Sequence, residues 1–519
     1  MACLGVFVGY FPVTTVAVSL PVIQQALGAS TSDLTWVTSS FVLPVAALIL
    51  TAGVFGDVHG RKKVFQAGLG CCVLGAAVAL SAQSIAQVWI GQALLGVGAA
   101  ALLPMTLALI SHAVPDPRER GKYIGLWTTS MMGALAVGPL IAGVIVEHAA
   151  WRWIYLLPIP LSLVTMVISA SVLTESRSHV ERKLDWPGQI TAALAIVALV
   201  YGVIEGGATS FGDVRVIASL VAAACFGAAF VLAEHRSPSP MLDLTLFRSA
   251  TFTGSALVVM ISFLGLIGFF FVFSLYMGMV QHLSTLEAGL RLLVVSVLPM
   301  ALGGAVGRLM RHIQARVLIA GGLVLTSVGL LALTGVGTDT SFGQLTWRLS
   351  LIGLGLGFAF PCVTAVAISS VPHHLAGMAS AGNNAFRQVG GALGPAVLGT
   401  LLTSGAVGAL GDHLSAAGLT ASTRHQVLDA VEAGGLGAVA RLDLGSESGP
   451  ALSAVSESFL DGLRLSLLVS AILLLAGAAL AAWLLRPSGS HRPAGSVAAR
   501  GERPDQTGAH PQGAAGDGR

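Results

Sequence analysis

Charged residues are scarce in this chain of 519 residues. Asp, Glu, Lys and Arg make up only 10% of it, against about 25% in an ordinary soluble domain, and none occurs before Asp33. Hydrophobic residues reach 55%, and apolar stretches of the roughly 20 residues needed to cross a bilayer recur along the sequence. This composition excludes a water-soluble domain and predicts an all-α polytopic membrane protein.

Basic residues and cysteines are missing where other classes of protein need them. The segment 1–32 has no Lys or Arg, whereas a secretory signal peptide begins with a basic region. We therefore expect YFPVTTVAVSLP (10–21) to lie in a first membrane span. The five cysteines all fall in apolar stretches without zinc-type spacing, so we expect no disulfide framework, no metal site and no cofactor.

Hydropathy predicts fourteen membrane-spanning helices. Their expected ranges are 3–24, 34–55, 64–83, 88–111, 123–145, 153–173, 188–205, 214–233, 251–279, 287–307, 317–336, 347–370, 378–404 and 462–485. Most of the 27 Lys and Arg residues lie on the side that carries Arg61 and the C-terminal tail. The positive-inside rule therefore places both termini in the cytoplasm. Abundant Arg, Ala and Gly suggest a high-GC bacterium, so we expect the bacterial inner membrane.

The two halves of the chain share a repeat. Gly98, Pro104 and Pro115 recur as Gly355, Pro361 and Pro372, and GPLIAG (138–143) recurs as GPAVLG (394–399). Chance similarity between Gly/Ala-rich helices is the alternative to a duplicated six-helix bundle, which many transporters use. The expected organisation is an N-terminal bundle (1–175), two linker helices with cytoplasmic loops (176–250), a C-terminal bundle with an outer loop at 405–461 (251–486) and a disordered tail (487–519).

The segment GVFGDVHGRKK (53–63) combines glycines, which allow close backbone approach, with an acid and a basic cluster. Taken alone, a basic cluster is usually only the positive-inside signal. The full pattern resembles the loop signature of the major facilitator superfamily, and a degenerate copy, GGAVGRLMRHIQAR (303–316), occurs where the duplication requires it. The resemblance implies a role in cytoplasmic gating for Gly53, Asp57, Gly60 and Arg61.

The segment GALAVGPLIAG (133–143) resembles the antiporter motif of that superfamily's export branch. Its small residues permit close helix packing, and in another membrane protein the segment would indicate only such packing. The expected packing residues are Gly133, Gly138, Pro139 and Gly143. DLTWVTSSFVL (33–43), WRWIYLLPIP (151–160) and GMASAGNNAFRQVGGALG (377–394) also resemble fourteen-helix drug:proton antiporters. The resemblance implies two six-helix bundles plus two linker helices, and multidrug efflux by alternating access.

Two charges that are usual in this branch are absent here. When helix 1 is aligned on Pro21, its usual acid corresponds to Pro12, and the usual arginine of helix 4 corresponds to Gln92. Because the absence of both charges leaves no buried charge without a partner, we interpret it as a concerted change. The alternative is a misalignment of two apolar stretches. The acids left as possible proton sites are Asp33, Glu205, Glu287 and Asp461.

Arg387 falls well inside an expected span, where a base costs ~2.5–3.5 kcal/mol at mid-depth. That cost favours a functional role, although bonds to neighbouring carbonyls or amides would also explain it. The expected substrate cavity contains polar residues and an adaptable apolar lining: Gln92, Asn383, Asn384, Arg387 and Gln388, with Trp36, Thr38, Met131 and Met132.

The sequence contains no recognisable catalytic triad, zinc cluster or nucleotide-binding domain. We therefore expect no enzymatic activity, no nucleic-acid partner and transport driven by an ion gradient, with H⁺ as the ion. The expected function is secondary active export of small amphipathic organic compounds by a monomer in the lipid bilayer. Two alternatives stay open: facilitated export without proton coupling, and a sensor or assembly role in which the segment 405–461 docks a partner.

Overall fold

The computed structural model describes residues 1–114, 117–176, 184–310, 312–371 and 376–485. The fourteen helices within these ranges that are long and apolar enough to cross a membrane confirm the predicted all-α fold and number of spans. The spanning elements are α1 (Ala2–Leu27), α2 (Thr31–His59), α3 (Arg61–Leu80), α4 (Ile85–Ala113), α5 (Pro117–His148), α6 (Pro158–Val172), α7 (Trp186–Ala208), α8 (Val214–Arg236), α9 (Ala250–Met279), α10 (Thr285–Leu309), α11 (Ala315–Leu333), α12 (Phe342–Ser369), α13 (Ala376–Ala416) and α15 (Ser448–Leu484).

Shorter helices connect some of these spans: η1 (Trp151–Tyr155), η2 (Leu244–Arg248), α14 (Ala421–Gly434), η4 (Leu436–Arg441) and η5 (Gly445–Glu447). The helix η1 precedes α6, whose first residue is Pro158; proline is well suited to this position because it has no N–H group to leave unpaired. The segment 487–519, expected as a disordered tail, lies outside the described residues.

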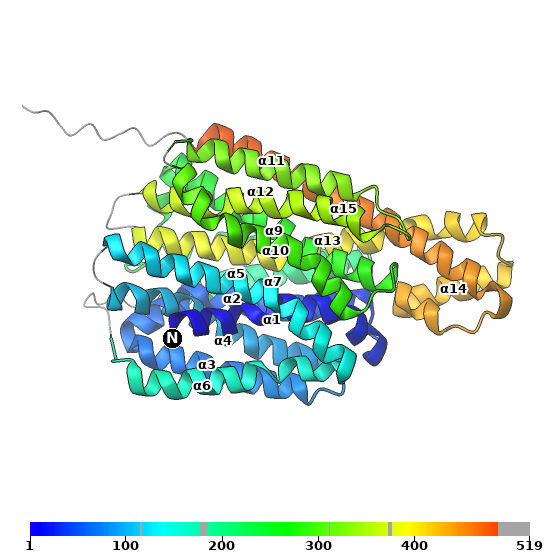
Figure 1. The fold of residues 1–519 in the computed structure, drawn as a ribbon, viewed down its shortest axis with the longest axis horizontal. Helices are drawn as coiled ribbons and strands as arrows, with labels where there is room; N and C mark the ends of the chain where they lie inside the picture. The colour runs from blue at the N-terminus through cyan, green and yellow to red at the C-terminus, as the bar shows by residue number, and fades with distance from the viewer. Residues whose placement is uncertain (115–116, 177–183, 311, 372–375, 486–519) are drawn as a thin grey trace, which may run out of the picture. The chain divides into compact units, whose positions relative to one another are not determined.

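The helices pack in the same pattern in the two halves of the chain (Figure 1). In the first half, α1 packs on α5, α3 on α4, α2 on α4 and α3 on α6; in the second, α9 packs on α13, α11 on α12, α10 on α12 and α11 on α15. The two halves meet where α5 packs on α10 and α13 packs on α2. We call α1–α6 the N-bundle and α9–α13 with α15 the C-bundle.

Glycines at matching positions allow matching helices to approach. A Cβ atom on Gly98 of α4 would lie 2.7 Å from the carbonyl oxygen of Gly68 in α3, and one on Gly355 of α12 would lie 2.3 Å from that of Gly322 in α11. Atoms at such distances overlap, so any larger residue would push these helices apart. The repeated glycines therefore have equivalent packing roles, which supports duplication over chance similarity.

Matching helices also begin with matching caps. Capping boxes start α2 and α10, with the pairs Ser30/Asp33 and Ser284/Glu287, and start α4 and α12, with the pairs Ser84/Gln87 and Ser341/Gln344. In each box a serine and an acid or amide three residues later satisfy N–H groups that a helix start leaves unpaired. The same solution at the same helices is a second sign of duplication.

Two spans continue beyond their expected ends. Expected at 378–404 and 462–485, they form α13, which ends at Ala416, and α15, which begins at Ser448. The extensions contact each other, because His413 Nε2 of α13 lies 2.8 Å from Asp461 Oδ2 of α15. Much of the outer loop expected at 405–461 is therefore helical, and Figure 1 shows α13, α14 and α15 reaching past the other helices.

Candidate functional site

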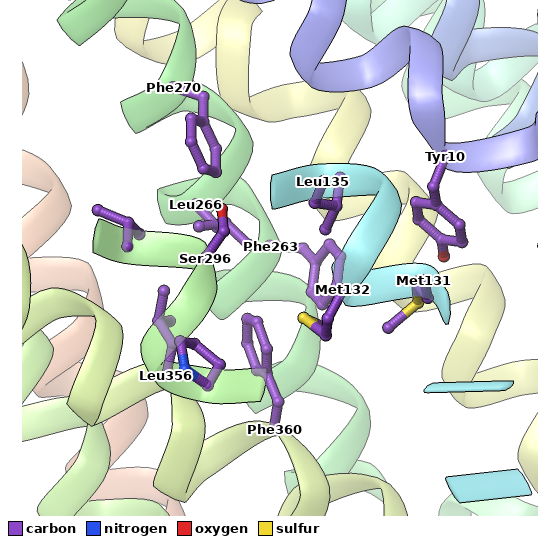
Figure 2. Close-up of a pocket in the computed structure, with 12 residues that line it drawn as sticks. Tyr10, Met131, Met132, Leu135, Phe263, Leu266, Phe270, Ser296, Leu356 and Phe360 are labelled. Carbon is purple, nitrogen blue, oxygen red and sulfur yellow. The ribbon is translucent and has the colours of Figure 1, made fainter. Parts of the chain in front are cut away.

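A cavity lies where the two bundles meet (Figure 2). The N-bundle contributes Tyr10 of α1 and three residues of α5, and the C-bundle contributes residues of α9, α10 and α12. The lining residues are Tyr10, Met131, Met132, Leu135, Phe263, Leu266, Phe270, Val295, Ser296, Pro299, Leu356 and Phe360. Five helices from both halves of the chain thus form a single site.

The lining is apolar, aromatic and rich in sulfur. The rings of Phe263 and Phe360 stack with centroids 4.9 Å apart, and Figure 2 shows Met131 and Met132 on the opposite wall. Methionine is flexible and polarisable, so it adapts to ligands of different shape and makes favourable contacts with aromatic rings. Among the lining residues, Tyr10 and Ser296 supply hydroxyl groups, which suits an organic molecule with few polar groups.

The cavity is contracted in this conformation. The space open to the centre of a water molecule is about 20 Å³, whereas one water needs about 10–15 Å³ by the same measure. A drug-sized ligand would therefore not fit unless the bundles move apart.

The bundles seal one end of this cavity, which we call the Pro21 end. A Cβ atom on Gly278 of α9 would lie 2.4 Å from Pro21 Cγ in α1, and Ser274 donates a hydrogen bond to the Ala17 carbonyl. The segment after α14 adds a further contact, because Arg441 Nη2 donates to the carbonyl of Gln25 over 3.1 Å. Direct contact between α1 and α9 therefore blocks access from this end.

Residues of the antiporter-type motif form part of the same seal. A Cβ atom on Gly143 of α5 would lie 2.3 Å from Leu286 Cα in α10. Pro139 is on the same side of α5, with its carbonyl oxygen 2.6 Å from the Cβ position of Gly289. Gly138 instead faces α1, where an added Cβ atom would lie 2.6 Å from Thr14 Oγ1, while a Cβ atom on Gly133 would meet nothing within 4 Å. Three of the four motif residues lie at helix contacts, and Gly133 does not.

The segment 53–63 forms a charged turn at the opposite end, which we call the Asp57 end. Arg61 Nη2 pairs with Asp57 Oδ1 at 2.8 Å. Gly60 adopts φ +116°, a conformation that other residues rarely take, and its Cβ position is only 2.5 Å from Glu175 Oε1. Gly53 has ordinary contact with Pro104 in α4. The turn thus joins α2, α3 and the end of α6.

Glu175 was not among the residues that the sequence singled out. Its carboxylate accepts a hydrogen bond from the Lys62 backbone N–H at 3.1 Å, and Lys62 Nζ donates to the Ala170 carbonyl at 2.7 Å. The signal that would have found Glu175 is an acid directly after a span, on the side of the basic cluster. It compensates part of the positive charge at this turn.

Arg387 lies next to the cavity rather than in its lining. Its guanidinium carbon is 5.3 Å from the centroid of Phe263, a lining residue. Its Nε is buried without a hydrogen-bond partner among the described residues, as are both amide atoms of Asn383. Gln388 reaches the cavity indirectly, since its Nε2 is 3.5 Å from the hydroxyl of Tyr10. Polar groups of α13 thus back the aromatic wall.

The other expected cavity residues lie elsewhere. Gln92 and Thr38 are buried, and each has an oxygen without a partner within the part of the chain that the structure describes. Trp36 packs between Trp89 and Tyr201, with centroids 6.4 and 6.1 Å away. Asn384 is half-buried. Of the nine residues named from the sequence, Met131 and Met132 line the cavity described here.

Three of the four acids expected as possible proton sites have structural partners. The carboxylates of Asp33 and Glu287 accept hydrogen bonds from the backbone N–H groups of Ser30 and Ser284 in the capping boxes of α2 and α10. Asp461 lies 2.8 Å from both Arg464 Nη1 and His413 Nε2. Glu205 is half-buried in α7. None of these acids is among the residues that line the cavity.

Comparisons with known proteins agree with this architecture. Residues 2–395 match the family model described as Major Facilitator Superfamily. The chain is 32% identical to the multidrug resistance protein Stp of Mycobacterium tuberculosis over 496 residues, covering 94% of this chain and 91% of that protein. It is 31% identical to the tetracenomycin C resistance and export protein of Streptomyces glaucescens, covering 92% and 89%.

A solved structure gives the same fold. A bacterial homologue of the human lysosomal transporter Spinster, in an inward-facing and unoccupied conformation, matches with a TM-score of 0.63 and 16% sequence identity. The match covers 93% of this chain and 95% of that one. At this identity the likeness concerns the arrangement of the helices alone.

Proposed function

The chain belongs to the Major Facilitator Superfamily, and from this premise we propose that it exports small amphipathic organic compounds, antibiotics among them, by proton-driven antiport. It is a multi-pass plasma-membrane protein with fourteen apolar helices, and its relatives include multidrug and antibiotic efflux pumps. The observation that carries the proposal is the cavity between the bundles, lined by Met131, Met132 and the stacked pair Phe263 and Phe360.

The mechanism that we propose is alternating access. The seal at the Pro21 end depends on backbone contacts of α5 with α10 and of α1 with α9, so a rocking motion of one bundle against the other would break it as a unit. Loss of these contacts would widen the cavity and expose it at the Pro21 end. With both termini in the cytoplasm, as the Lys/Arg distribution predicts, this end faces outward and release there amounts to export.

We further propose that a monomer suffices, that no cofactor or enzymatic step is needed, and that the H⁺ gradient supplies the energy. Facilitated export without proton coupling is the second candidate. It is favoured by the neutral lining of the cavity and by Pro12 at the position where related antiporters carry an acid.

Proton coupling is testable in proteoliposomes. The substrate is first chosen as a compound to which expression of the protein confers resistance in an antibiotic panel. If one H⁺ exchanges for one substrate molecule, accumulation should rise about tenfold per unit of imposed pH gradient, because one pH unit corresponds to ~1.4 kcal/mol. Equal substrate concentrations on both sides at every pH gradient would instead establish facilitated export.

The cavity itself is testable by filling it. We expect Ser296→Phe to lower resistance to large substrates by at least about tenfold and to small ones less, because added bulk in a packed site costs ~1–3 kcal/mol. The control is Ser171→Phe, which adds the same ring on the exposed face of α6. Minimum inhibitory concentrations across the panel, normalised to protein in the membrane, measure the effect. An equal loss for all compounds and both variants would reject this cavity as the substrate site.

A further inference from the structure

Two carboxylates outside the cavity lie buried against each other at the Asp57 end. Asp185 precedes α7 and Glu234 lies in the last turn of α8, and they are only 8% and 3% exposed. One oxygen of each is bonded: Asp185 Oδ1 accepts from the Gly188 N–H at 2.9 Å, and Glu234 Oε2 accepts from the Leu242 N–H at 3.2 Å. The other oxygens, Asp185 Oδ2 and Glu234 Oε1, are buried without a hydrogen-bond partner among the residues that the structure describes.

The two unpaired oxygens border the same small space. A Cβ atom on Gly188 would lie 2.8 Å from Glu234 Oε1 and 3.0 Å from Asp185 Oδ2. A side chain at residue 188 would therefore come within contact distance of both carboxylates. Because this residue is glycine, both oxygens border a gap beside it.

Charge makes this arrangement costly unless something binds. Two buried carboxylates that share a site cannot both be ionised cheaply, and one of them takes up a proton. Among the described residues, no basic group pairs with either of them. Asp243 adds further negative potential, while the neighbouring His235 and Arg236 are exposed. The groups of α2 and α13 that bond to the nearby Gln189 and Asp243 are uncharged: Ala47 and Thr51, and Met378.

The pair sits where the linker helices join the two bundles. On the N-bundle side, Gln189 donates to the Ala47 carbonyl of α2 at 2.7 Å and is hydrogen-bonded to Thr51. On the C-bundle side, Leu242 packs with residues of α9 and α13, and the Asp243 N–H is 3.1 Å from Met378 Sδ. A change in the separation of Asp185 and Glu234 would therefore move groups that contact both bundles.

We propose that Asp185 and Glu234 form a proton-binding site beside Gly188, in which one of the two side chains is a carboxylic acid and the other a carboxylate. Water supplies the proton, which binds one oxygen of the pair. The bound proton holds α7 and α8 together with α2 and the segment 237–243, and its loss drives the two carboxylates apart. The site would thus let pH at the Asp57 end regulate movement of the bundles, a consequence that rests on the proposed transport function.

Proton binding can be measured without any substrate. The full-length protein in lipid nanodiscs is examined by infrared difference spectroscopy between pH about 5 and about 8, and the C=O band of a buried protonated carboxylic acid is followed. We expect the wild type to have a band that Glu234→Gln and Asp185→Asn each remove. The matched control, Asp243→Asn, retains it, because the Asp243 side chain caps η2 instead of facing the gap.

Specific outcomes would overturn the proposal. A band that persists in both Glu234→Gln and Asp185→Asn would mean that the pair binds no proton. A band that depends on Na⁺ or K⁺ at constant pH would mean that a metal ion occupies the gap. Having two single variants guards against misfolding of either one, and normal size-exclusion profiles are required of both.

The regulatory step has its own measurement. In proteoliposomes in which the pH difference across the membrane is held constant, the export rate of the wild type should change about fivefold when the pH on both sides is shifted together, the low end of usual coupling between sites. Glu234→Gln, which mimics the protonated acid, should abolish this dependence. If the wild type has the infrared band but the export rate of Glu234→Gln keeps its pH dependence, the regulatory step alone is rejected. If the wild type exports none of the compounds, the proposed function is refuted, while the proton-binding site is unaffected.

Discussion

Replacing Gly143 by alanine is expected to reduce export about 5- to 150-fold while leaving the protein folded in the membrane. The added Cβ atom would lie 2.3 Å from Leu286 Cα and 2.7 Å from its backbone nitrogen, and backbone atoms cannot rotate away as a side chain does. Overpacking of this kind costs ~1–3 kcal/mol. That free energy would lower the population of the state sealed at the Pro21 end by about 5- to 150-fold. The clash exists only when α5 and α10 are in contact, so the variant favours states that are open at the Pro21 end.

Gly133→Ala is the matched control, because it makes the same change ten residues earlier in the same helix. Its Cβ atom would meet nothing within 4 Å, so we expect export within about twofold of wild type. Export is measured in proteoliposomes, and opening at the Pro21 end by labelling of a cysteine introduced near Gly278. Equal loss in both variants would show that the motif glycines act through helix flexibility and not through the α5–α10 contact.

The number of membrane spans was predictable because hydropathy reports directly on it. A span needs a long run of apolar residues, and all fourteen such runs became helices. The extensions of α13 and α15 were not predictable in this way. Past the expected span ends these helices contact each other, as between His413 and Asp461, and a local hydropathy pattern carries no information about that partner.

The cavity was predictable only in part. Met131 and Met132 were named from the sequence, whereas Phe263 and Phe360 were not, because a phenylalanine in a span looks the same whether it faces lipid, another helix or a cavity. Asp185 and Glu234 are separated by an entire helical hairpin, and only the packing of α7 on α8 brings them together. Glu175 likewise acquires its partner Lys62 through the fold.

Arg387→Gln is expected to reduce export at least about tenfold, because it removes the cation that backs the aromatic wall of the cavity. The guanidinium stacks on Phe263, which in turn stacks on Phe360, and a desolvated cation–π contact contributes about 2 kcal/mol. The buried, unpartnered Nε also gives Arg387 a donor that a substrate or water could use once the bundles separate. Lysine keeps the charge but loses the planar stack. The export rate of Arg387→Lys should therefore lie between those of the wild type and Arg387→Gln.

Arg348 of α12 provides a matched control within the same bundle. It also stacks on an aromatic ring, with its guanidinium carbon 5.4 Å from the centroid of Trp347, and its Nε and Nη1 are buried without hydrogen-bond partners in the described part of the chain. Arg348 does not line the cavity, and neither does Trp347, whereas the ring partner of Arg387, Phe263, does. We therefore expect Arg348→Gln to keep export within about twofold of wild type, with both variants inserted and melting within about 3 °C of wild type. If Arg387→Gln also exports normally, the cost of burying this cation is met by packing alone, and the polar cluster of α13 has no part in transport.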